Sequence, residues 1–251
     1  MRNSVFATAL LVLVLGCGSA WAAGAYNWTG FYAGLNTGFA LNDSSYSVSP
    51  TGEYLTNPGL TPSNSLRTDS GDFSDSAFTL GGQVGYNFQC GCFVYGLETD
   101  FNYNGTDESS YVNRALSSPL TGNFVHTVTQ QIDYFGTLRG RFGYTLSDRC
   151  LIYATGGLAY GTVSSNSNVL FTSTLDNYIG SSSGLQAGWT IGVGSEYALC
   201  GCWSIKLEYL YVDLGSKSYT YSPQPVYGPV TYTTSIDSAQ NVFRVGLNYK
   251  F

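Results

Sequence analysis

Cysteine is the residue type in this chain with the widest range of reactions, because a thiolate can attack a disulfide, become oxidised or bind a soft metal. The cysteines that follow residue 22 are Cys90, Cys92, Cys150, Cys200 and Cys202. Four of them form two Cys-Gly-Cys tripeptides, each between two apolar stretches, and each tripeptide is predicted to be a tight turn. The two turns join different strand pairs and should face each other across the structure, which disfavours one shared metal site. We expect disulfides within or between neighbouring turns, and an odd number of thiols leaves at least one without a partner in the chain.

The chain contains one histidine, His126, and the sequence around it predicts a position in or beside a loop. A hydrolytic enzyme needs a nucleophile and a base held together by the surrounding fold. A single histidine in a loop gives no sign of such an arrangement, and the favoured interpretation is a solvated side chain. We therefore predict that the protein is not an enzyme.

Charged residues are few, and those within the regular stretches share one face. The acids are Glu98, Asp100, Asp133, Glu196 and Glu208, and the bases are Arg139, Arg141, Lys206, Arg244 and Lys250. Balanced charges in a narrow interior are tolerable when they are paired and hydrogen-bonded. We expect them to form a polar plug, because a small closed sheet is filled by its own side chains. The alternative is a conducting pore lined by the same groups.

The elements that would position these charges are stretches in which every second residue is large and apolar. This period of two is typical of a β-strand with one apolar face. The last stretch shows it most clearly: its alternate residues are Phe243, Val245, Leu247, Tyr249 and Phe251, and the sequence stops on an aromatic. The predicted strands cover residues 31–40, 76–89, 93–104, 130–145, 150–163, 185–199, 203–214 and 239–251.

Within 130–145 the pattern places Ile132 and Tyr134 on the apolar face and Gln131 and Asp133 on the polar face. Trp28 and Trp203 are expected near one rim, where tryptophan suits the boundary between membrane and water.

Long and short connections alternate between these strands. The long ones cover about 41–75, 105–129, 164–184 and 215–238, are rich in Ser, Asn and Gly, and are predicted to be loops. The turns between them are short. An even number of strands with this asymmetry predicts an all-β, eight-stranded antiparallel up-and-down transmembrane β-barrel, with four long extracellular loops and short periplasmic turns. Such a barrel also pairs the last strand with the first and leaves no open edge.

Composition agrees with a membrane barrel whose outer face contacts lipid. Only 10% of residues are charged, against about a quarter in a soluble domain. The alternative, a secreted soluble β-sandwich, is less favoured for the same reason. The net charge is −6 and the first long loop is acidic, which disfavours nucleic acid as a partner.

The N-terminus predicts export from the cytoplasm. A basic start, an apolar run over 5–15 and a small-x-small site ending at Ala22 indicate a signal peptide over residues 1–22, followed by a barrel domain over 23–251. A competing interpretation is a lipoprotein signal that ends at Cys17.

Four motifs then carry a family resemblance: NWTGFYAG at 27–34, YFGTLRGR at 134–141, YATGGLAYG at 153–161 and VGLNYKF at 245–251. They resemble motifs of the alphaproteobacterial outer-membrane β-barrel family, which includes major surface antigens and hemin-binding proteins of rhizobia-related bacteria. The resemblance implies a location in the outer membrane of a Gram-negative bacterium. It also implies insertion by the outer-membrane assembly machinery, which reads a C-terminal strand ending in Phe. The long first loop and the Cys-Gly-Cys turns depart from the family pattern.

We expect a structural and surface role, which means envelope integrity and contact with a host or extracellular ligand through the loops, with no resident cofactor. Two alternatives stay open. The resemblance implies a hemin-binding surface protein, in which His126 or one of Tyr46, Tyr111 and Tyr221 would be the axial ligand. The other alternative is a small porin-like channel.

Overall fold

The computed structural model describes residues 26–51, 68–73, 75–115, 123–172, 176–224 and 231–251. The predicted signal peptide lies outside these residues. Within them the structure is a single antiparallel sheet. Its strands are β1 (Gly30–Asn42), β2 (Ser44–Thr51), β3 (Asp69–Phe73), β4 (Ser76–Cys90), β5 (Phe93–Ala115), β6 (Asn123–Ser147), β7 (Cys150–Phe171), β8 (Asp176–Ala198), β9 (Trp203–Tyr221), β10 (Pro223–Gln224) and β11 (Thr231–Lys250). No helix among the described residues is long and apolar enough to cross a membrane.

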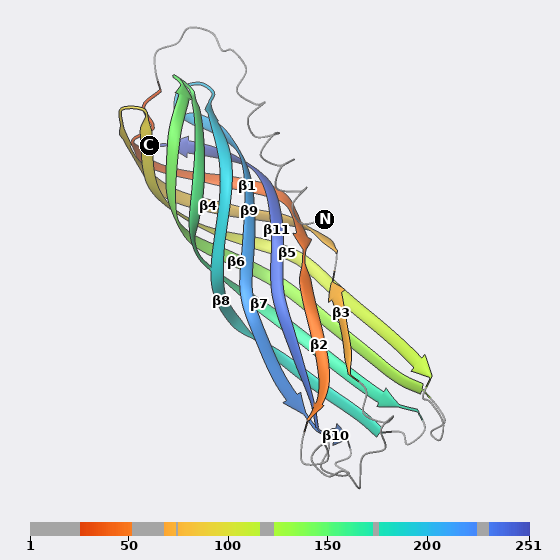
Figure 1. Cartoon of the computed structure of the whole chain (residues 1–251). Helices are drawn as coiled ribbons and strands as arrows, with labels where there is room; N and C mark the ends of the chain where they lie inside the picture. Colours follow the sequence, from red (N-terminus) through yellow and green to blue (C-terminus); the bar gives the residue numbers. More distant parts are fainter. Residues whose placement is uncertain (1–25, 52–67, 74, 116–122, 173–175, 225–230) are drawn as a thin grey trace.

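Eight of these strands form a closed ring in the order β1, β4, β5, β6, β7, β8, β9 and β11 (Figure 1). The ring closes where the first strand pairs with the last, from Tyr32 opposite Lys250 to Asn42 opposite Gln240. The C-terminal strand therefore has no open edge along this length, and the prediction of an all-β antiparallel fold is confirmed. The short strands β2 and β3 form a hairpin that continues the wall beyond β1.

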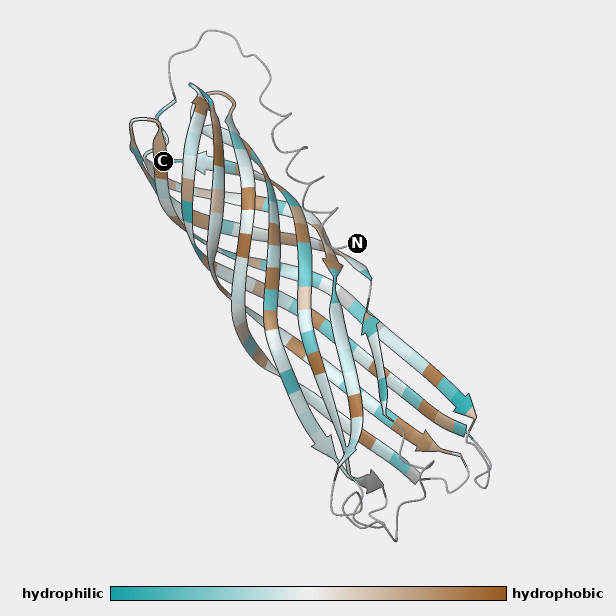
Figure 2. Ribbon diagram, in the orientation of Figure 1, coloured by the Kyte–Doolittle hydropathy of each residue, from teal (hydrophilic) through white to brown (hydrophobic). Residues whose placement is uncertain are grey.

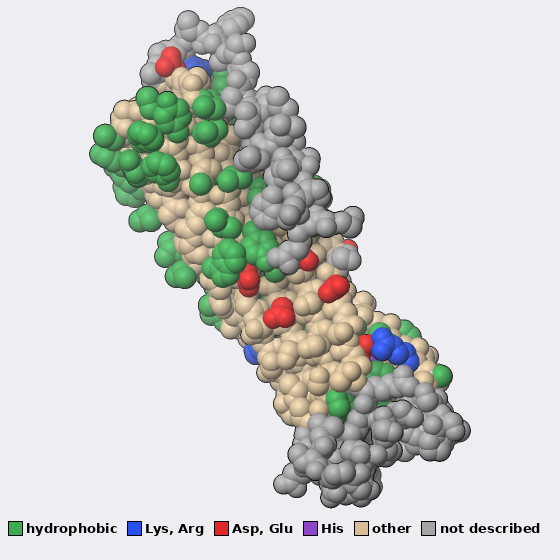
Figure 3. Space-filling view, in the orientation of Figure 1, with side chains coloured by type: hydrophobic (Ala, Val, Ile, Leu, Met, Phe, Trp, Pro, Cys, Tyr) green, Lys and Arg blue, Asp and Glu red, His purple; other side chains and the backbone are tan. Residues whose placement is uncertain are grey.

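In the half of the ring that contains the C-terminus, apolar side chains point outward and polar ones inward. Phe31, Leu35 and Phe39 of β1 are exposed, whereas Tyr32 and Asn36 between them are buried. Figure 3 shows hydrophobic side chains gathered over this half of the molecule. An apolar exterior around a polar interior is the pattern that lipid contact requires.

The other half reverses this arrangement, and we name it the extension. It comprises β2, β3, β10 and the outer parts of the long strands, at 105–115, 123–132, 163–171, 176–187, 215–221 and 231–238. Apolar side chains now point inward and form a buried cluster of Tyr46, Val48, Phe73, Phe124, Val128, Val169, Phe171, Tyr178, Tyr221, Tyr232 and Ile236. Figure 2 shows the strands becoming paler and more hydrophilic between these apolar positions. A core of this kind suits a wall surrounded by water.

The prediction of four long loops is therefore wrong for most of the residues that the structure describes in them. The segments at 105–115, 123–129, 164–171 and 231–238 are strand, as are β2 and β3 within the first one. These segments do alternate, but with Ser, Thr and Asn outside and aromatic or branched residues inside. A search for large apolar residues on the outer face does not detect that pattern.

Irregularities in the ladders mark the boundary between the two halves. The β5–β6 register shifts between Tyr103 and Thr106, and the β6–β7 register shifts between Ile132 and Tyr134. On the opposite wall the β9–β11 register shifts at Gly215, whose φ of 77° lies in the left-handed region that favours glycine. One extra residue exchanges the inward and outward faces of a strand.

The bulge in β6 explains one wrong face assignment. Ile132 was predicted to share the lipid face with Tyr134, yet it is buried at 1% exposure, and Gln131 is exposed instead. Trp28 was likewise predicted at the membrane boundary. It is buried inside the end of the ring, packed with Val94, Leu151 and Ala198, while Trp203 is exposed beside Tyr249.

The reversal of faces predicts opposite tolerance of charge at two outward positions of β5. Leu97 is 66% exposed in the apolar half and Tyr111 is 65% exposed in the extension. Leu97→Arg should cost about 2–4 kcal/mol of folding free energy in a bilayer, whereas Tyr111→Arg should change it by about 0.5 kcal/mol or less. Urea titration of folding into phospholipid vesicles measures both. Equal costs at the two positions would contradict the assignment of the membrane boundary.

Candidate functional site

Eight of the ten predicted interior charges lie together inside the apolar half of the ring. They are Glu98 and Asp100 on β5, Arg139 and Arg141 on β6, Glu196 on β8, Lys206 and Glu208 on β9, and Arg244 on β11. All eight side chains are buried. The set contains four carboxylates and four cations, so its formal charges cancel.

Arg139 and Arg244 form the centre of this network. Arg139 contacts Asp100 at 2.8 Å and Glu208 at 3.2 Å, and it also pairs with Glu98. Arg244 reaches Asp100 at 2.7 Å and Glu208 at 2.5 Å. Both carboxylates are therefore shared by two guanidinium groups that come from strands on different sides of the ring. These contacts join β5, β6, β9 and β11 across the interior.

Two further cations complete the network toward the end that carries the short turns. Lys206 donates to Glu98 at 3.0 Å. Arg141 pairs with Glu196 and lies over the ring of Tyr153, with 3.6 Å between the guanidinium carbon and the ring centroid. Each cation thus has a carboxylate within reach, as buried charges require.

Tyrosine hydroxyls belong to this network, and sequence analysis missed them. Tyr32 donates to Glu98 at 2.8 Å and Tyr153 donates to Glu208 at 2.8 Å. Each ring lies directly against a glycine on another strand, Gly85 for Tyr32 and Gly194 for Tyr153, where a side chain would collide with it. The available signal was a tyrosine on the polar face of a strand, with glycine on the polar face of a neighbouring strand.

Asp133 and Lys250 were assigned to the same interior set, and that assignment is wrong. Asp133 sits at the β6 bulge, is partly exposed and accepts a hydrogen bond from Gln131 at 2.9 Å. Lys250 lies at the end of the ring, where it donates to the carbonyl of Asn27 and contacts the ring of Tyr26. A bulge and a strand end are both places where simple alternation fails.

The network predicts that an Asp→Asn substitution lowers the free energy of unfolding by different amounts at two positions. Asp100→Asn removes a charge shared by two buried guanidinium groups and should cost about 3–5 kcal/mol of unfolding free energy. Asp133→Asn removes a partly exposed charge and should cost at most about 0.5 kcal/mol. Denaturant unfolding of both variants in the same vesicles measures the difference. Similar costs would show that Asp100 is not held in a buried network.

His126 is the centre of a second polar cluster, located in the extension. It was predicted to be a solvated loop residue, but it lies on β6 and is buried. Its Nδ1 donates to Asp69 at 2.8 Å, and its Nε2 accepts from the hydroxyl of Ser167, 3.2 Å away. Asp69 also pairs with Arg114 at 3.2 Å and accepts from Tyr46. This cluster connects β3 to β5 and β6, where no backbone ladder joins β3 to β5 in the described part of the chain.

The order aspartate, histidine, serine is that of a serine-hydrolase triad. Ser167 is 1% exposed, however, and its hydroxyl is also within 2.7 Å of the Tyr221 hydroxyl and 3.3 Å of Thr234. The serine is thus enclosed by side chains and presents no open face to a substrate. The arrangement has the properties of a structural hydrogen-bond cluster, and the absence of enzymatic activity stays a prediction.

The candidate hemin ligands fall into two groups. His126, Tyr46 and Tyr221 are buried and hydrogen-bonded inside the extension, whereas Tyr111 is exposed on its outer face. Of the four, only Tyr111 could meet a large planar ligand without opening the extension.

Burial in the extension lowers the pKa of His126 below its ordinary value of 6.5, although the hydrogen bond that its ring donates to Asp69 opposes the shift. The folded chain therefore binds this proton less tightly than the unfolded chain does. The stabilising contribution of neutral His126 is present above pH 6.5 and is lost as the pH falls below that value.

We predict that the extension opens more readily at pH 5.5 than at pH 7.5. Hydrogen exchange of β6 and β7 amides near His126, corrected for intrinsic rates, measures this change. His126→Gln should remove most of the pH dependence in this interval, because the variant lacks the imidazole. An unchanged pH dependence in the variant would assign the effect to other groups.

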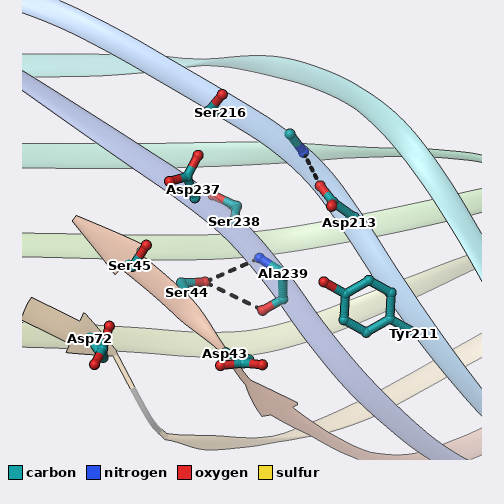
Figure 4. Close-up of a pocket in the computed structure, with 11 residues that line it drawn as sticks. Asp43, Ser44, Ser45, Asp72, Tyr211, Asp213, Ser216, Asp237, Ser238 and Ala239 are labelled. Carbon is teal, nitrogen blue, oxygen red and sulfur yellow. Dashed lines mark hydrogen bonds between the residues drawn. The ribbon is translucent and has the colours of Figure 1, made fainter. Parts of the chain in front are cut away.

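An acidic hollow lies on the outer surface at the boundary between the two halves (Figure 4). It has a volume of about 400 Å³, and its lining includes Asp43, Asp72, Asp213 and Asp237. The side chains are spread around its rim, and the Asp213 carboxylate accepts from the amide of Gly215 at 2.7 Å. Within the described residues no group of three such side chains is arranged to hold a metal ion.

The cysteine turns lie at the opposite end from the extension. Cys90, Cys92 and Cys200 are exposed, Cys202 is half-exposed, and all four are free thiols. The predicted disulfides within or between these turns are therefore not present in the structure. Cys150 is buried at the start of β7, in the same end of the ring.

Comparison with known proteins gives the family. Residues 8–251 match the model of the outer membrane protein beta-barrel domain. The 31 kDa outer-membrane immunogenic protein of Brucella melitensis biotype 1 is 35% identical over 230 residues, which are 90% of this chain and 85% of that protein. The chain belongs to this family of outer-membrane β-barrel proteins. The resemblance found in the four motifs is confirmed, and the protein is located in the outer membrane of a Gram-negative bacterium.

A second relative agrees with this placement. The 22 kDa outer membrane protein of Rhizobium leguminosarum bv. viciae is 35% identical over 153 residues, which are 59% of this chain and 60% of that protein. Among solved structures, the outer membrane protein OprG from Pseudomonas aeruginosa is 15% identical, covers 90% of this chain and 97% of its own, and has a TM-score of 0.49.

Proposed function

We propose that the protein is an eight-stranded barrel whose role is structural and surface-exposed: it strengthens the envelope and presents its extension to the surroundings. In this orientation the short turns and the C-terminus face the periplasm, and the extension and its connecting segments lie outside the cell. The observation that carries the proposal is the closed charge network, because it fills the membrane-spanning half with paired side chains. The immunogenic Brucella relatives support a surface-exposed location.

The network also argues against the channel alternative. A pore needs a continuous water-filled path, whereas Arg139, Arg244 and their carboxylates meet across the interior at 2.5–3.2 Å. Hemin binding through His126 is disfavoured in the same way, because both ring nitrogens already have partners.

Planar-bilayer recording separates a plug from a pore. The wild-type protein should give no steady unit conductance, and Asp100→Asn should give at most brief, irregular openings. Steady, discrete channels in the wild type would overturn the proposed role. Insertion is verified in the same preparation by the resistance of the barrel to protease.

We also propose that β11 is the signal for the outer-membrane assembly machinery. Its outward residues Phe243, Val245, Leu247 and Tyr249 alternate toward the C-terminus. Phe251 follows directly after the strand, and its ring packs edge-on against Tyr249. Membrane lipid is the partner of this face.

Deletion of Phe251 should leave export intact and strongly reduce the amount assembled in the outer membrane. Cell fractionation and heat-modifiability on gels measure the two steps separately. Tyr111→Ala, an exposed aromatic outside the signal, is the control. Normal assembly of the deletion variant would contradict the proposal.

A further inference from the structure

The two Cys-Gly-Cys turns have the same local structure but different neighbours. Each is a short connection between antiparallel strands, and the φ angles of their central glycines are 60° and 57°. In each turn the carbonyl of the second cysteine accepts a backbone hydrogen bond from the adjoining strand. The donor is Thr145 at 2.9 Å for Cys92, and it is Lys250 at 2.8 Å for Cys202. The first turn therefore adjoins a hydroxyl side chain, and the second adjoins a cation.

A hollow of about 250 Å³ opens beside the second turn, at the end of the ring that contains the C-terminus (Figure 1). Its lining includes both cysteines of that turn, together with Arg149, Lys250, Tyr26 and Asn27. Among the described residues that line it, two are cations and none is an acid. The hollow thus combines a pair of thiols with two positive charges.

Both cations of the hollow are held in place by backbone carbonyls. Nη1 of Arg149 donates to the carbonyl of Leu199 at 2.8 Å, directly before the turn. Nζ of Lys250 donates to the carbonyl of Asn27 and lies 4.4 Å from the centroid of the Tyr26 ring. Neither cation takes part in an ion pair between described residues. Their charges can therefore interact with an anion that enters from solution.

The two thiols of the turn are able to react with each other and with a molecule from solution. Residues two positions apart have Cα atoms at most about 7 Å apart, and a tight turn brings them within the range of a disulfide. Cys200 is exposed and Cys202 is half-exposed, so a disulfide in solution can reach the pair. Exposed disulfides are also labile, which allows the pair to be reduced again.

We propose that the Cys200–Cys202 turn is a thiol–disulfide exchange site for small anionic disulfides, which Arg149 and Lys250 hold beside the thiols. Carboxylates suit this hollow, because guanidinium and ammonium groups donate charge-assisted hydrogen bonds to them. The location of the site in the periplasm rests on the orientation proposed above, whereas the exchange chemistry does not.

The exchange proceeds in two steps that balance. The thiolate of Cys200, the more exposed cysteine, attacks one sulfur of the small disulfide. A mixed disulfide forms, the small S–S bond breaks, and one small thiolate leaves and takes a proton from water. The thiolate of Cys202 then attacks the sulfur of Cys200, closes the Cys200–Cys202 disulfide and releases the second small thiolate. The turn loses two electrons and two protons, and the small disulfide gains them as two thiols.

A soft metal ion is the less favoured occupant of the hollow. Two cysteines supply only two sulfur ligands, and no group of three Cys, His, Asp or Glu side chains among the described residues is arranged to hold a metal ion. The positive charges of Arg149 and Lys250 also repel a metal cation.

The test compares the two turns within one molecule, the full mature protein folded in detergent at about pH 8, where thiolates are populated. The protein is treated with oxidised glutathione, which is anionic, or with cystamine, which is a cationic disulfide. Acid quenching, blocking of residual thiols and peptide mass spectrometry give the oxidation rate of each turn. The ratio of the glutathione rate to the cystamine rate should be about tenfold larger at Cys200–Cys202 than at Cys90–Cys92. Salt at about 1 M should reduce this difference below about twofold.

Substitutions assign the preference to the cations. Lys250→Gln and Arg149→Gln should each lower the glutathione preference of the second turn about threefold. Thr145→Lys is the matched variant, because the backbone of Thr145 has the same place at the first turn that Lys250 has at the second. It should raise the glutathione preference of the Cys90–Cys92 turn about threefold. Cys202→Ser should stop the reaction at a mixed disulfide on Cys200.

Equal preferences of the two turns in the wild type would overturn the inference, and so would a Thr145→Lys variant with an unchanged first turn. A mixed disulfide that persists in the wild type would contradict the closing step. If a Gln variant does not fold, the comparison of the two wild-type turns still decides the question. These outcomes are separate from those of the proposed function, because exchange in detergent does not depend on membrane orientation or conductance.

Discussion

Four carboxylates and four cations share the interior of a ring with only eight strands, and their mutual neutralisation is the constraint on which the rest of the structure depends. Water-filled space is scarce in so narrow a ring, so each charge must find its partner on another strand. Arg139 and Arg244 meet the same two carboxylates from different walls, which links strands that are distant in the sequence. The same contacts support the proposal that the interior is a plug and not a pore.

The second constraint is the change of solvent along the ring. Where lipid surrounds the wall, charges and amides are kept inside and aromatic residues outside. Where water surrounds it, the faces exchange, and His126, Asp69 and Ser167 are enclosed by an aromatic cluster. At this boundary, bulges near Asp133 and Gly215 shift which residues of a strand point inward and which point outward. The extension thus resembles the core of a soluble β-protein built on a membrane-spanning ring.

Much of the ring and most of its charge network could be predicted from the sequence, because alternation and lipid exclusion act residue by residue. Glu98, Arg139 and Glu208 follow directly from that alternation. The pattern could not place Asp133, because a bulge shifts the inward and outward alternation of a strand and has no fixed sequence signal. It could not place Lys250 either, because the strand ends at this residue. His126 was wrongly assigned to a loop for another reason. In its segment the outward residues are Ser and Thr, and such a strand resembles a loop when only large apolar residues are counted.

The central claim is that the interior charges act as one coupled unit, and a double-mutant cycle tests it most directly. Asp100→Asn, Arg244→Gln and the double variant are unfolded by denaturant in the same vesicles. The account predicts that the two single effects are not additive, with a coupling free energy of about 1–3 kcal/mol. Additive effects within about 0.5 kcal/mol would mean that the two groups do not interact, and that the interior is not the closed network described for this ring.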